Sequence, residues 1–598
     1  MTLPPGAAVV VLGPSAMDLA RRIKGLLPGS RIHGLARRVA GADESFDETV
    51  AHLRRLFAEG VPVVGLCAAG ILIRAVAPLL SDKRREPAVV AVADDGGSVV
   101  PLLGGHRGAN ALARAIAAMT GGHAAVTTAG DVRLGLALDD PPPGWTVANP
   151  ESAKAIAASA LAGRKVGLRV EAGRADWLMP LSGGDEPRIR VTDRLVTAPG
   201  KDLIFHPPVL AVGVGCERGT SADELTALVE RTLAQAGLAK ASVAAIVSLD
   251  LKADEEAMHA LAAALSVPVR FFDAATLEAE TPRLASPSEA VFREVGCHGV
   301  AEGAALAAVG GDGTLIVPKT KSRRATCAVA RALAELDPDR IGRTQGRLTV
   351  VGIGPGTPDW RTPEASRVLG EAEDVVGYGL YLDLLGEVIA GKRRHESNLS
   401  EEEARVRKAL DLAAAGRRVA LVSSGDAGIY ALAALVFELL DRENRADWNR
   451  IALKVVPGVS AFQAAAARIG APMGHDFCLI SLSDLLTPWA DIERRLAAAA
   501  AGDFVVALYN PASRRRQNQL VAARDILMAA RGGETPVVLA RNIGRAGERI
   551  EVIPLRDLGP DRVDMLTLVL IGSSNSRLIE RGVGRWVYTP RGYERKRR

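Results

Sequence analysis

Short apolar runs recur along the whole chain, and each is followed by a turn of glycine or other small residues. The runs at 7–12, 61–66 and 88–93 have the length and composition of buried strands. The segments 16–27 and 71–80 follow two of these turns and carry apolar residues at helical spacing. Because strand, loop and helix alternate, this part predicts an α/β layer domain with a mostly parallel sheet.

The same alternation continues through the middle of the chain. A helix is predicted at 222–236 with Ser221 as its N-cap, another begins at Gly299, and a third covers 319–326. The predicted strands here are 209–214, 244–249 and 267–272. The chain is therefore expected to be a multidomain α/β protein, with linkers at the proline-rich stretch 139–150 and the polar stretch 336–346.

In the last part, buried runs repeatedly end in small-residue loops that can line one pocket. These runs are 348–351, 419–422, 451–456, 504–509, 536–540 and 567–571. The first feeds the glycine turn of 350–362, VVGIGPGTPDWRT, which is neither a G-x-G-x-x-G fingerprint nor a P-loop. Pro355 also removes a backbone N–H that a phosphate cradle would use. The turn suits a ligand other than a phosphate, or it is an ordinary tight turn.

Composition and charge exclude several classes of protein. A net charge of +5 over 598 residues is too small for a typical nucleic-acid-binding surface, and it suits an anionic small molecule or an ordinary surface equally. The five cysteines are scattered and never in C-x-x-C spacing, and no Cys/His cluster indicates a metal, so no metal site is expected. No signal peptide and no apolar run of ~18 residues is found, so we expect a reduced, cytoplasmic protein with no membrane partner.

Two loops of the first domain place polar side chains at predicted helix starts. Arg74 lies just inside one helix, and His106 and Asn110 lie among the glycines of the other loop. Free N–H groups at helix starts favour anions, so these side chains suit a carboxylate-rich ligand. The alternative, slightly favoured on residue chemistry alone, is that Asn110 caps its helix and His106 is an exposed loop residue.

Three residues of the middle part are further candidates. Cys216 follows a strand near a helix start, where the helix dipole lowers a thiol pKa, so a nucleophile is one interpretation. A buried, inert cysteine is the favoured one. Glu302 and Lys319 are interpreted as ligand or structural contacts rather than acid–base groups.

These stretches resemble the cobalamin biosynthesis protein G family, the cobalt-precorrin-5A hydrolases. Residues 7–140 resemble its N-terminal domain through GILIRAVAPLLSDKRREPAVVAV and LLGGHRGANALARAIA. Residues 207–335 resemble its C-terminal domain through GVGCERGTS, GVAEGAAL and KTKSRRAT. We expect hydrolase-family domains at 1–140 and 207–335, with 141–206 as a linker and middle module. The candidate substrate contacts are Arg74, His106, Asn110, Cys216 and Glu302.

Six motifs, in order, make the last part similar to the tetrapyrrole (class III) S-adenosylmethionine-dependent methyltransferases. They are VVGIGPG, SSGDAGIY, VVPGVSAFQAAAARIGAP, HDFCLISLSDLLTPW, VVALYNPASRRR and DMLTLVLIGSSNS. The resemblance is closest to the precorrin-3B C-17-methyltransferase branch and covers residues 347–590. It implies two α/β subdomains, 346–462 and 463–598, with S-adenosyl-L-methionine between them.

The resemblance also implies site residues. Asp426, on residue chemistry alone, caps a helix or accepts hydrogen bonds from a ligand. The implied cofactor contacts are Pro355, Ser424, Gly425, Asp426, Ile429, Ser460, Ala461, Asn510 and Gly544. Tyr378 and Tyr381 lie in a segment that resembles the substrate side. Residues 514–516, three arginines, meet acidic groups of the macrocycle or form a solvated charge run. No catalytic acid or base is assigned.

The two resemblances together imply a bifunctional enzyme of cobalamin biosynthesis. The C-terminal half is expected to methylate C-17 of precorrin-3B or cobalt-factor III, with contraction of the ring. The N-terminal half is expected to open a δ-lactone of the macrocycle, or to bind an intermediate without catalysis. Methylation of ribosomal RNA is the alternative for the C-terminal half, and the small net charge argues against it. A homodimer through the methyltransferase region is the expected assembly.

Overall fold

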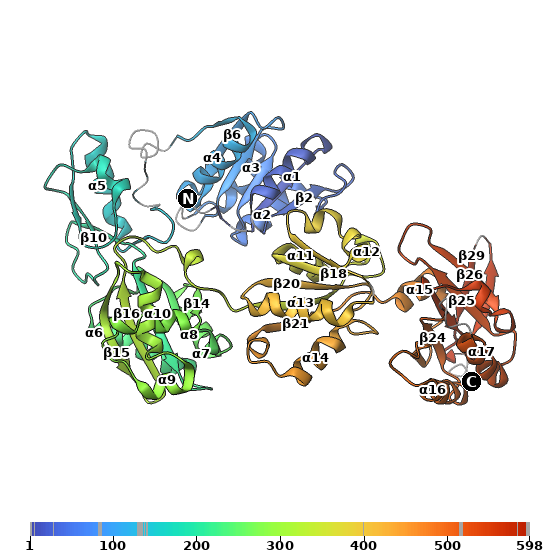
Figure 1. Cartoon of the computed structure of the whole chain (residues 1–598). Helices are drawn as coiled ribbons and strands as arrows, with labels where there is room; N and C mark the ends of the chain where they lie inside the picture. Colours follow the sequence, from blue (N-terminus) through green and yellow to red (C-terminus); the bar gives the residue numbers. More distant parts are fainter. Residues whose placement is uncertain are drawn as a thin grey trace. The chain divides into compact units, whose positions relative to one another are not determined.

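The computed structural model describes most of the chain and divides it into two compact units. The units are Met1–Arg343 and Thr344–Arg598. The residues outside the description are 1–2, 5, 28, 82–85, 128–135, 137, 139–140, 399, 513–517, 583 and 594–598, together with the side chain of His106. Figure 1 colours the chain from blue at the N-terminus to red at the C-terminus.

The first sheet of Met1–Arg343 has the order β3-β2-β1-β4-β5-β6-β7. Its strands are β1 (Ala8–Val11), β2 (Arg31–Leu35), β3 (Glu44–Phe46), β4 (Val63–Leu66), β5 (Val89–Val92), β6 (Ser98–Leu103) and β7 (His123–Ala124). All neighbouring pairs are parallel except β5 and β6, as expected for a mostly parallel sheet.

Helices cover both faces of this sheet (Figure 1). The apolar faces of α1 (Met17–Leu26) and α4 (Ala109–Thr120) share one core with the strands. Those of α2 (Thr49–Ala58) and α3 (Ala69–Val76) share the other. Continuous apolar strands such as Ala8–Val11 follow from this burial on two sides.

Residues 146–206 form a small sheet of their own, with the order β8-β11-β10-β9. Its elements are β8 (Thr146–Val147), α5 (Ala153–Leu161), β9 (Gly167–Val170), β10 (Arg188–Val191) and β11 (Leu203–His206). The rings of Trp145, Trp177 and Phe205 pack edge to face at its centre. The intervening segment is therefore an ordered module with its own apolar core.

The next sheet has the order β14-β13-β12-β16-β15. Its strands are β12 (Leu210–Cys216), β13 (Val243–Leu249), β14 (Val269–Phe272), β15 (Thr314–Lys321) and β16 (Ala325–Arg331). The helices α6 (Ala222–Gln235) and α7 (Glu256–Leu265) share one core with the strands, while α8 (Ala274–Glu278) and α10 (Val300–Val309) share the other. The short α9 (Glu289–Val295) precedes α10. Ser221 caps α6 as predicted, since its side chain accepts from the N–H of Glu224.

The predicted helix at 319–326 is wrong. These residues are the end of β15, a tight turn and the start of β16, which pair antiparallel from Lys321 and Thr326 onward. The basic residues of KTKSRRAT hide the strand pattern, whereas pairing along the whole of β16 fixes the hairpin.

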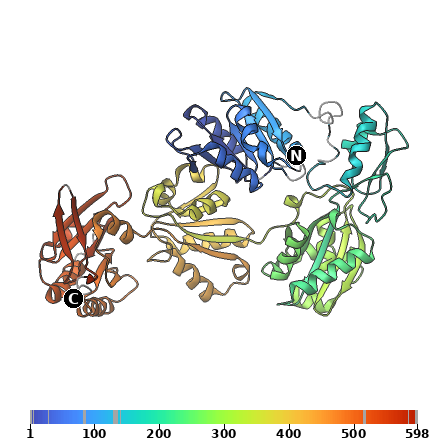
Figure 2. The same ribbon diagram turned by 180° about the vertical axis from the view of Figure 1, so that it is seen from behind.

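The first sheet of Thr344–Arg598 is entirely parallel, with the order β19-β18-β20-β17-β21. Its strands are β17 (Arg347–Gly352), β18 (Asp374–Tyr378), β19 (Arg393–Ser397), β20 (Arg418–Ser423) and β21 (Ala452–Val456). One face packs on α13 (Glu402–Ala414) and α14 (Leu432–Glu443), the other on α11 (Pro363–Glu371) and α12 (Gly379–Asp383). Figure 2 shows these strands between the two helix layers from the opposite side.

The second sheet of this unit is mixed, with the order β23-β24-β27-β25-β26. Its strands are β23 (Phe477–Ser481), β24 (Val505–Tyr509), β25 (Pro536–Arg541), β26 (Arg549–Pro554) and β27 (Thr567–Ile571). The helices α16 (Trp489–Ala501) and α17 (Asn518–Arg531) pack on one face, and α15 (Ala461–Ile469) packs on the other. A small sheet of β22 (Gly470–Ala471), β29 (Gly584–Tyr588) and β28 (Arg577–Arg581) completes the unit.

The predicted multidomain α/β organisation is confirmed. In the part of the chain that the structure describes, no helix is long and apolar enough to cross a membrane.

Candidate functional site

Three loops meet at the carboxyl ends of the neighbouring strands β20, β17 and β21. Gly354 and Gly425 exchange two backbone hydrogen bonds, of 3.1 Å and 2.8 Å, and both have a positive φ that favours glycine. A Cβ added at Gly458 would lie 2.2 Å from the carbonyl oxygen of Gly425. The glycine turn that begins at Gly352 is thus one wall of a site built by close backbone contact.

Asp426 ties two of these loops together. Its Oδ1 accepts from the N–H of Gly428 at 2.8 Å, and its Oδ2 accepts from the N–H of Gly458 at 3.0 Å. The expectation that Asp426 caps the next helix is wrong, because α14 begins later and its N-cap is Ala431. The carboxylate instead fixes the shape of the loops.

Ile429, Ser460 and Ala461 lie where these loops join the second sheet. Ser460 is the N-cap of α15, and the side-chain oxygen of Gln463 accepts from its N–H at 3.0 Å. Ile429 and Ala461 pack against the core formed by α15 and the second sheet. The hydroxyl of Tyr430, whose φ is positive, donates to the carbonyl of Leu479 at 2.9 Å.

Arg545 holds Pro355 and Ser424 together, and the sequence analysis missed it. Its Nε donates to the carbonyl oxygen of Pro355 and its Nη2 to the Oγ of Ser424, each at 2.8 Å. Its guanidinium lies 5.6 Å from the ring centre of Tyr381. The adjacent Gly544 contacts Pro355 directly, since a Cβ there would lie 3.2 Å from its Cγ. The only sequence feature that could have pointed to Arg545 is its place beside Gly544 in the loop after β25.

Two aromatic residues stand beside Arg545. The rings of Tyr378 and Tyr381 pack edge to face with centroids 5.2 Å apart. Burial raises the pKa of Tyr381, so its hydroxyl stays protonated at neutral pH. Arg545 therefore links Tyr381 to the loop of Pro355, and Tyr378 packs against Tyr381.

Asn510 follows β24 with a positive φ, and its Nδ2 donates to the Oγ of Ser481 at 3.1 Å. The preceding Tyr509 accepts from the N–H of Phe462 at 3.4 Å through its hydroxyl. Burial raises the pKa of Tyr509 to about 12. The predicted arginine cluster, Arg514, Arg515 and Arg516, lies outside the described residues.

In Met1–Arg343, an open cavity of about 580 Å³ lies at the carboxyl ends of β1, β4 and β5. Leu12, Cys67 and Asp94 line it where the strand order reverses, which is where α/β sheets bind ligands. Burial raises the pKa of the Cys67 thiol to about 11, so no thiolate forms there at neutral pH.

Of the sequence-predicted residues of this domain, Arg74 and Asn110 do not line that cavity. Antiparallel β6 carries the chain to the opposite edge of the sheet, where Gly104 lies against Pro87 and the turn of His106 follows. Asn110 is buried in the first turn of α4, whose N-cap is Gly108, so the expectation that Asn110 caps this helix is wrong. Arg74 lies in the last turn of α3, so its predicted place at the start of that helix is wrong.

The contacts of Cys216 and Glu302 indicate structural roles. Cys216 is the last residue of β12, and burial raises its pKa, which agrees with the favoured inert interpretation. Glu302 is buried, and its carboxylate accepts from the backbone N–H groups of Ala285, Ser286 and Lys319 at 2.8–3.0 Å. A carboxylate with three such bonds clamps a loop and a strand to α10.

Comparison with known proteins agrees with this division. The model for Tetrapyrrole (Corrin/Porphyrin) Methylases matches residues 347–559. Those for the Cobalamin synthesis G N-terminal and C-terminus regions match 51–131 and 210–330. The chain therefore combines a region of the methylase family with a second α/β unit that matches the two cobalamin synthesis G models.

The relatives define the family further. The chain is 47% identical over 249 residues to precorrin-3B C(17)-methyltransferase of Sinorhizobium sp, across 97% of that protein and 42% of this chain. The chain belongs to the tetrapyrrole (corrin/porphyrin) methylase family through this region, and its N-terminal unit resembles cobalamin synthesis protein G.

Two further matches cover parts of the chain. Cobalamin biosynthesis protein CobIJ of Mycobacterium tuberculosis is 41% identical over 335 residues, which are 52% of this chain, and the match spans 64% of that relative's length. A crystal structure of the methyltransferase CobJ is 42% identical, with a TM-score of 0.39, and covers 41% of this chain and all of that one.

Proposed function

We propose that Thr344–Arg598 is an S-adenosyl-L-methionine-dependent methyltransferase that acts on C-17 of precorrin-3B or cobalt-factor III, with ring contraction, in cobalamin biosynthesis. The observation that carries this proposal is the meeting of the family motifs in one site. Gly354 pairs with Gly425, Asp426 binds Gly458, and Arg545 joins Pro355 to Ser424. The 47% identity to a C(17)-methyltransferase supports the substrate.

The site suits a zwitterionic nucleoside such as S-adenosyl-L-methionine. Glycine lets the loop backbones approach one another closely, which leaves N–H and C=O groups at their rims. The hydroxyl of Ser423 is buried and has no hydrogen-bond partner within the described residues. Pro355, Ser424, Gly425, Asp426, Ile429, Ser460, Ala461, Asn510 and Gly544 are the proposed cofactor contacts.

Methyl transfer from a sulfonium depends on alignment of the two reactants more than on acid–base catalysis. S-adenosyl-L-methionine would supply an electrophilic methyl group. An electron-rich carbon of the macrocycle would attack that methyl in line as the bond to sulfur breaks, with S-adenosyl-L-homocysteine as the leaving group. The hydrogen bonds of Asp426 and Arg545 hold the loops in place, which lowers the entropic cost of that alignment. Tyr378 and Tyr381 are proposed to face the tetrapyrrole, and the three arginines at 514–516 to meet its carboxylates.

The N-terminal unit is proposed to act on the same class of molecule. Hydrolysis of a macrocycle lactone follows the family resemblance, with Arg74, His106, Asn110, Cys216 and Glu302 as substrate contacts. A non-catalytic binding role is the second candidate, favoured by the structural hydrogen bonds of Glu302 and the raised pKa of Cys216. We propose domains at 1–140, 141–206, 207–335, 346–462 and 463–598, a homodimer, and a cytoplasmic location.

The test is to incubate the purified chain with S-adenosyl-L-methionine and either precorrin-3B or cobalt-factor III. Products are followed by mass spectrometry, with ribosomal RNA as a parallel substrate. We expect addition of one methyl group to at least one tetrapyrrole and none to RNA. Absence of a methylated tetrapyrrole with both substrates, or methylation of RNA alone, would overturn the proposal.

A further inference from the structure

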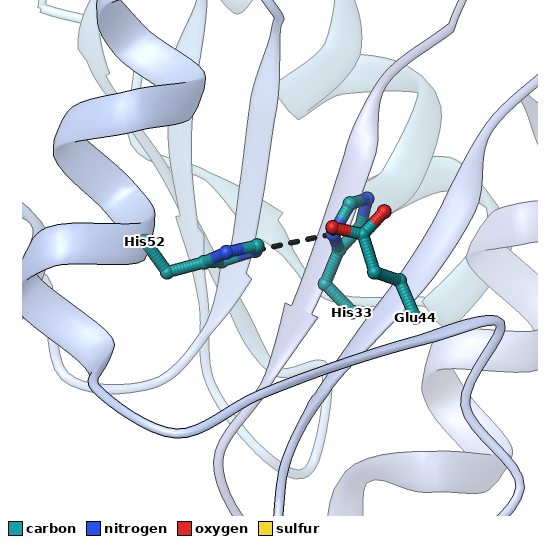
Figure 3. A group of neighbouring side chains, drawn as sticks. All are labelled: His33, Glu44 and His52. Carbon is teal, nitrogen blue, oxygen red and sulfur yellow. Dashed lines mark hydrogen bonds and ion pairs between the residues drawn. The ribbon is translucent and has the colours of Figure 1, made fainter. Parts of the chain in front are cut away.

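Two histidines and a glutamate converge on one face of the N-terminal sheet. His33 lies on β2 and Glu44 on the neighbouring β3, where the two residues are register partners, so their side chains leave the same face. His52 lies on α2, and its ring points at His33 (Figure 3). The three side chains come from three different elements, so they do not form a short sequence motif.

Two of the distances between their polar atoms match those of metal ligands, and the third is at most 4.8 Å. His33 Nδ1 lies 3.1 Å from His52 Nε2 and 3.6 Å from the Oε1 of Glu44, and the three ligand atoms all lie within 4.8 Å of one another. Ligands about 2.0–2.2 Å from a zinc ion, at angles of about 90–120°, are about 2.8–3.8 Å apart. A metal ion therefore fits with little change in the backbone.

Packing holds the two imidazoles in place. His33 is 5% and His52 is 6% exposed. The ring of Phe46 stacks on His52 at 4.3 Å and fixes its orientation. The Glu44 side chain is 33% exposed, which gives an ion a route from solvent.

We propose that His33 Nδ1, His52 Nε2 and the carboxylate of Glu44 bind a divalent transition-metal ion of the zinc or cobalt type. Imidazole and carboxylate suit such borderline ions, and three protein ligands leave one position for water. The sequence provided no reason to expect a metal site, because residues 33, 44 and 52 match no short metal-binding motif.

Two arginines oppose the cation and limit its affinity. Nη2 of Arg55 donates to Glu44 Oε1 at 2.9 Å and lies 3.3 Å from His52 Nδ1, while Arg31 lies 3.7 Å from Glu44. Without metal, these contacts favour a proton on His52 Nε2, shared with His33. Metal binding requires that proton to leave Nε2, and Arg55 to turn toward Glu59, which already lies 3.3 Å from its Nη1. The competing account is that this cluster is only a hydrogen-bonded core pair.

Titration calorimetry on the full chain, stripped with chelator, separates the two accounts. Zn²⁺ and Co²⁺ are titrated into the wild type, His52→Gln and Glu44→Gln, with His123→Gln on exposed β7 as the matched control. We expect one equivalent to bind, at least about 100-fold more weakly in His52→Gln and Glu44→Gln, and unchanged in His123→Gln. The visible spectrum of bound Co²⁺ should show nitrogen ligation that His52→Gln alters.

Two outcomes would overturn the proposal. One is no stoichiometric binding by wild type, and the other is binding that neither Glu44→Gln nor His52→Gln weakens. The Glu44 side chain is one-third exposed, so Glu44→Gln tests the site even where a change of buried His52 prevents folding. Arg55→Gln removes a nearby positive charge and is expected to tighten binding; equal or weaker affinity would contradict the arrangement described here.

Discussion

The glycine-loop site of Thr344–Arg598 and the histidine cluster of the N-terminal sheet are built in opposite ways. The first lies at the ends of parallel strands, where backbone groups of Gly354, Gly425 and Gly458 contact one another. The second lies within the sheet, where side chains of His33, Glu44 and His52 meet under a helix. Sites of the first kind leave a local sequence signature, whereas sites of the second kind depend on register and helix packing.

The largest effect should come from filling the contact at Gly458. A Cβ in Gly458→Ala would meet the carbonyl oxygen of Gly425 at 2.2 Å and force the loops apart. We expect at least about a 100-fold loss of kcat/KM for methyl transfer, because a displacement of about 1 Å can cost that much. Gly370→Ala in α11 is the control, since a Cβ there meets nothing within 4 Å. Near-normal activity of Gly458→Ala would show that the loop contact is not needed.

The next effect should come from Arg545→Ala. Loss of two charge-assisted hydrogen bonds, each typically about 1.5–3 kcal/mol, frees the loop of Pro355 from Ser424. We expect a fall in kcat/KM of about 10–100-fold, with partial rescue by Arg545→Lys, which can restore one bond but not both. The exposed Arg549, paired with Glu551 at 3.5 Å, provides Arg549→Ala as the control. Equal activity of Arg545→Ala and Arg549→Ala would remove Arg545 from the account.

A smaller effect, on stability and dependent on pH, should come from a second histidine–glutamate pair, Glu278 and His298, in the same unit as the histidine cluster. Glu278 hydrogen-bonds His298 Nδ1 and raises the pKa of that ring above 6.5, while His298 lowers the pKa of Glu278 below 4.5. The histidine contribution to stability is present below pH 6.5 and is lost as the pH rises through its folded pKa. The glutamate contribution is present above pH 4.5 and is lost as the pH falls.

Thermal unfolding of the wild type and His298→Gln measures this pair. The difference in Tm between them should be larger near pH 5.5 than near pH 8.5, because the pair is fully charged only at the lower value. The same difference at both values would mean that the pair carries no ionic stabilisation.

The smallest effect is expected for methyl transfer by the Glu44→Gln variant. Glu44→Gln should leave kcat/KM for methyl transfer within about twofold, because Glu44 belongs to the other compact unit. Measuring metal binding and methyl transfer on the same preparation of Glu44→Gln checks this. A fall of more than tenfold in methyl transfer would show that the two sites are coupled.

The sequence predicted what is encoded locally. Buried runs followed by glycine turns gave the strands and the loops of Pro355, Gly425 and Ser460, because burial on two faces leaves a continuous apolar run. Arg545 escaped prediction because its hydrogen-bond partner Pro355 lies 190 residues away along the chain.

Other features depended on pairing that the sequence pattern did not reveal. Residues 319–326 were expected to be helical, yet antiparallel pairing with β16 draws them into a hairpin. His33, Glu44 and His52 are brought together by the register of β2 and β3 and by the packing of α2. Their spacing in sequence matches no short metal-binding motif, so spacing alone could not find them.

The most direct test of the central claim is a single turnover with isotopically labelled methyl in S-adenosyl-L-methionine. The full chain is mixed with precorrin-3B or cobalt-factor III, and the product is examined by nuclear magnetic resonance. We expect the label on C-17 of a ring-contracted macrocycle with wild type, and little or none with Gly458→Ala. Label on another carbon, or no transfer to either tetrapyrrole, would contradict it.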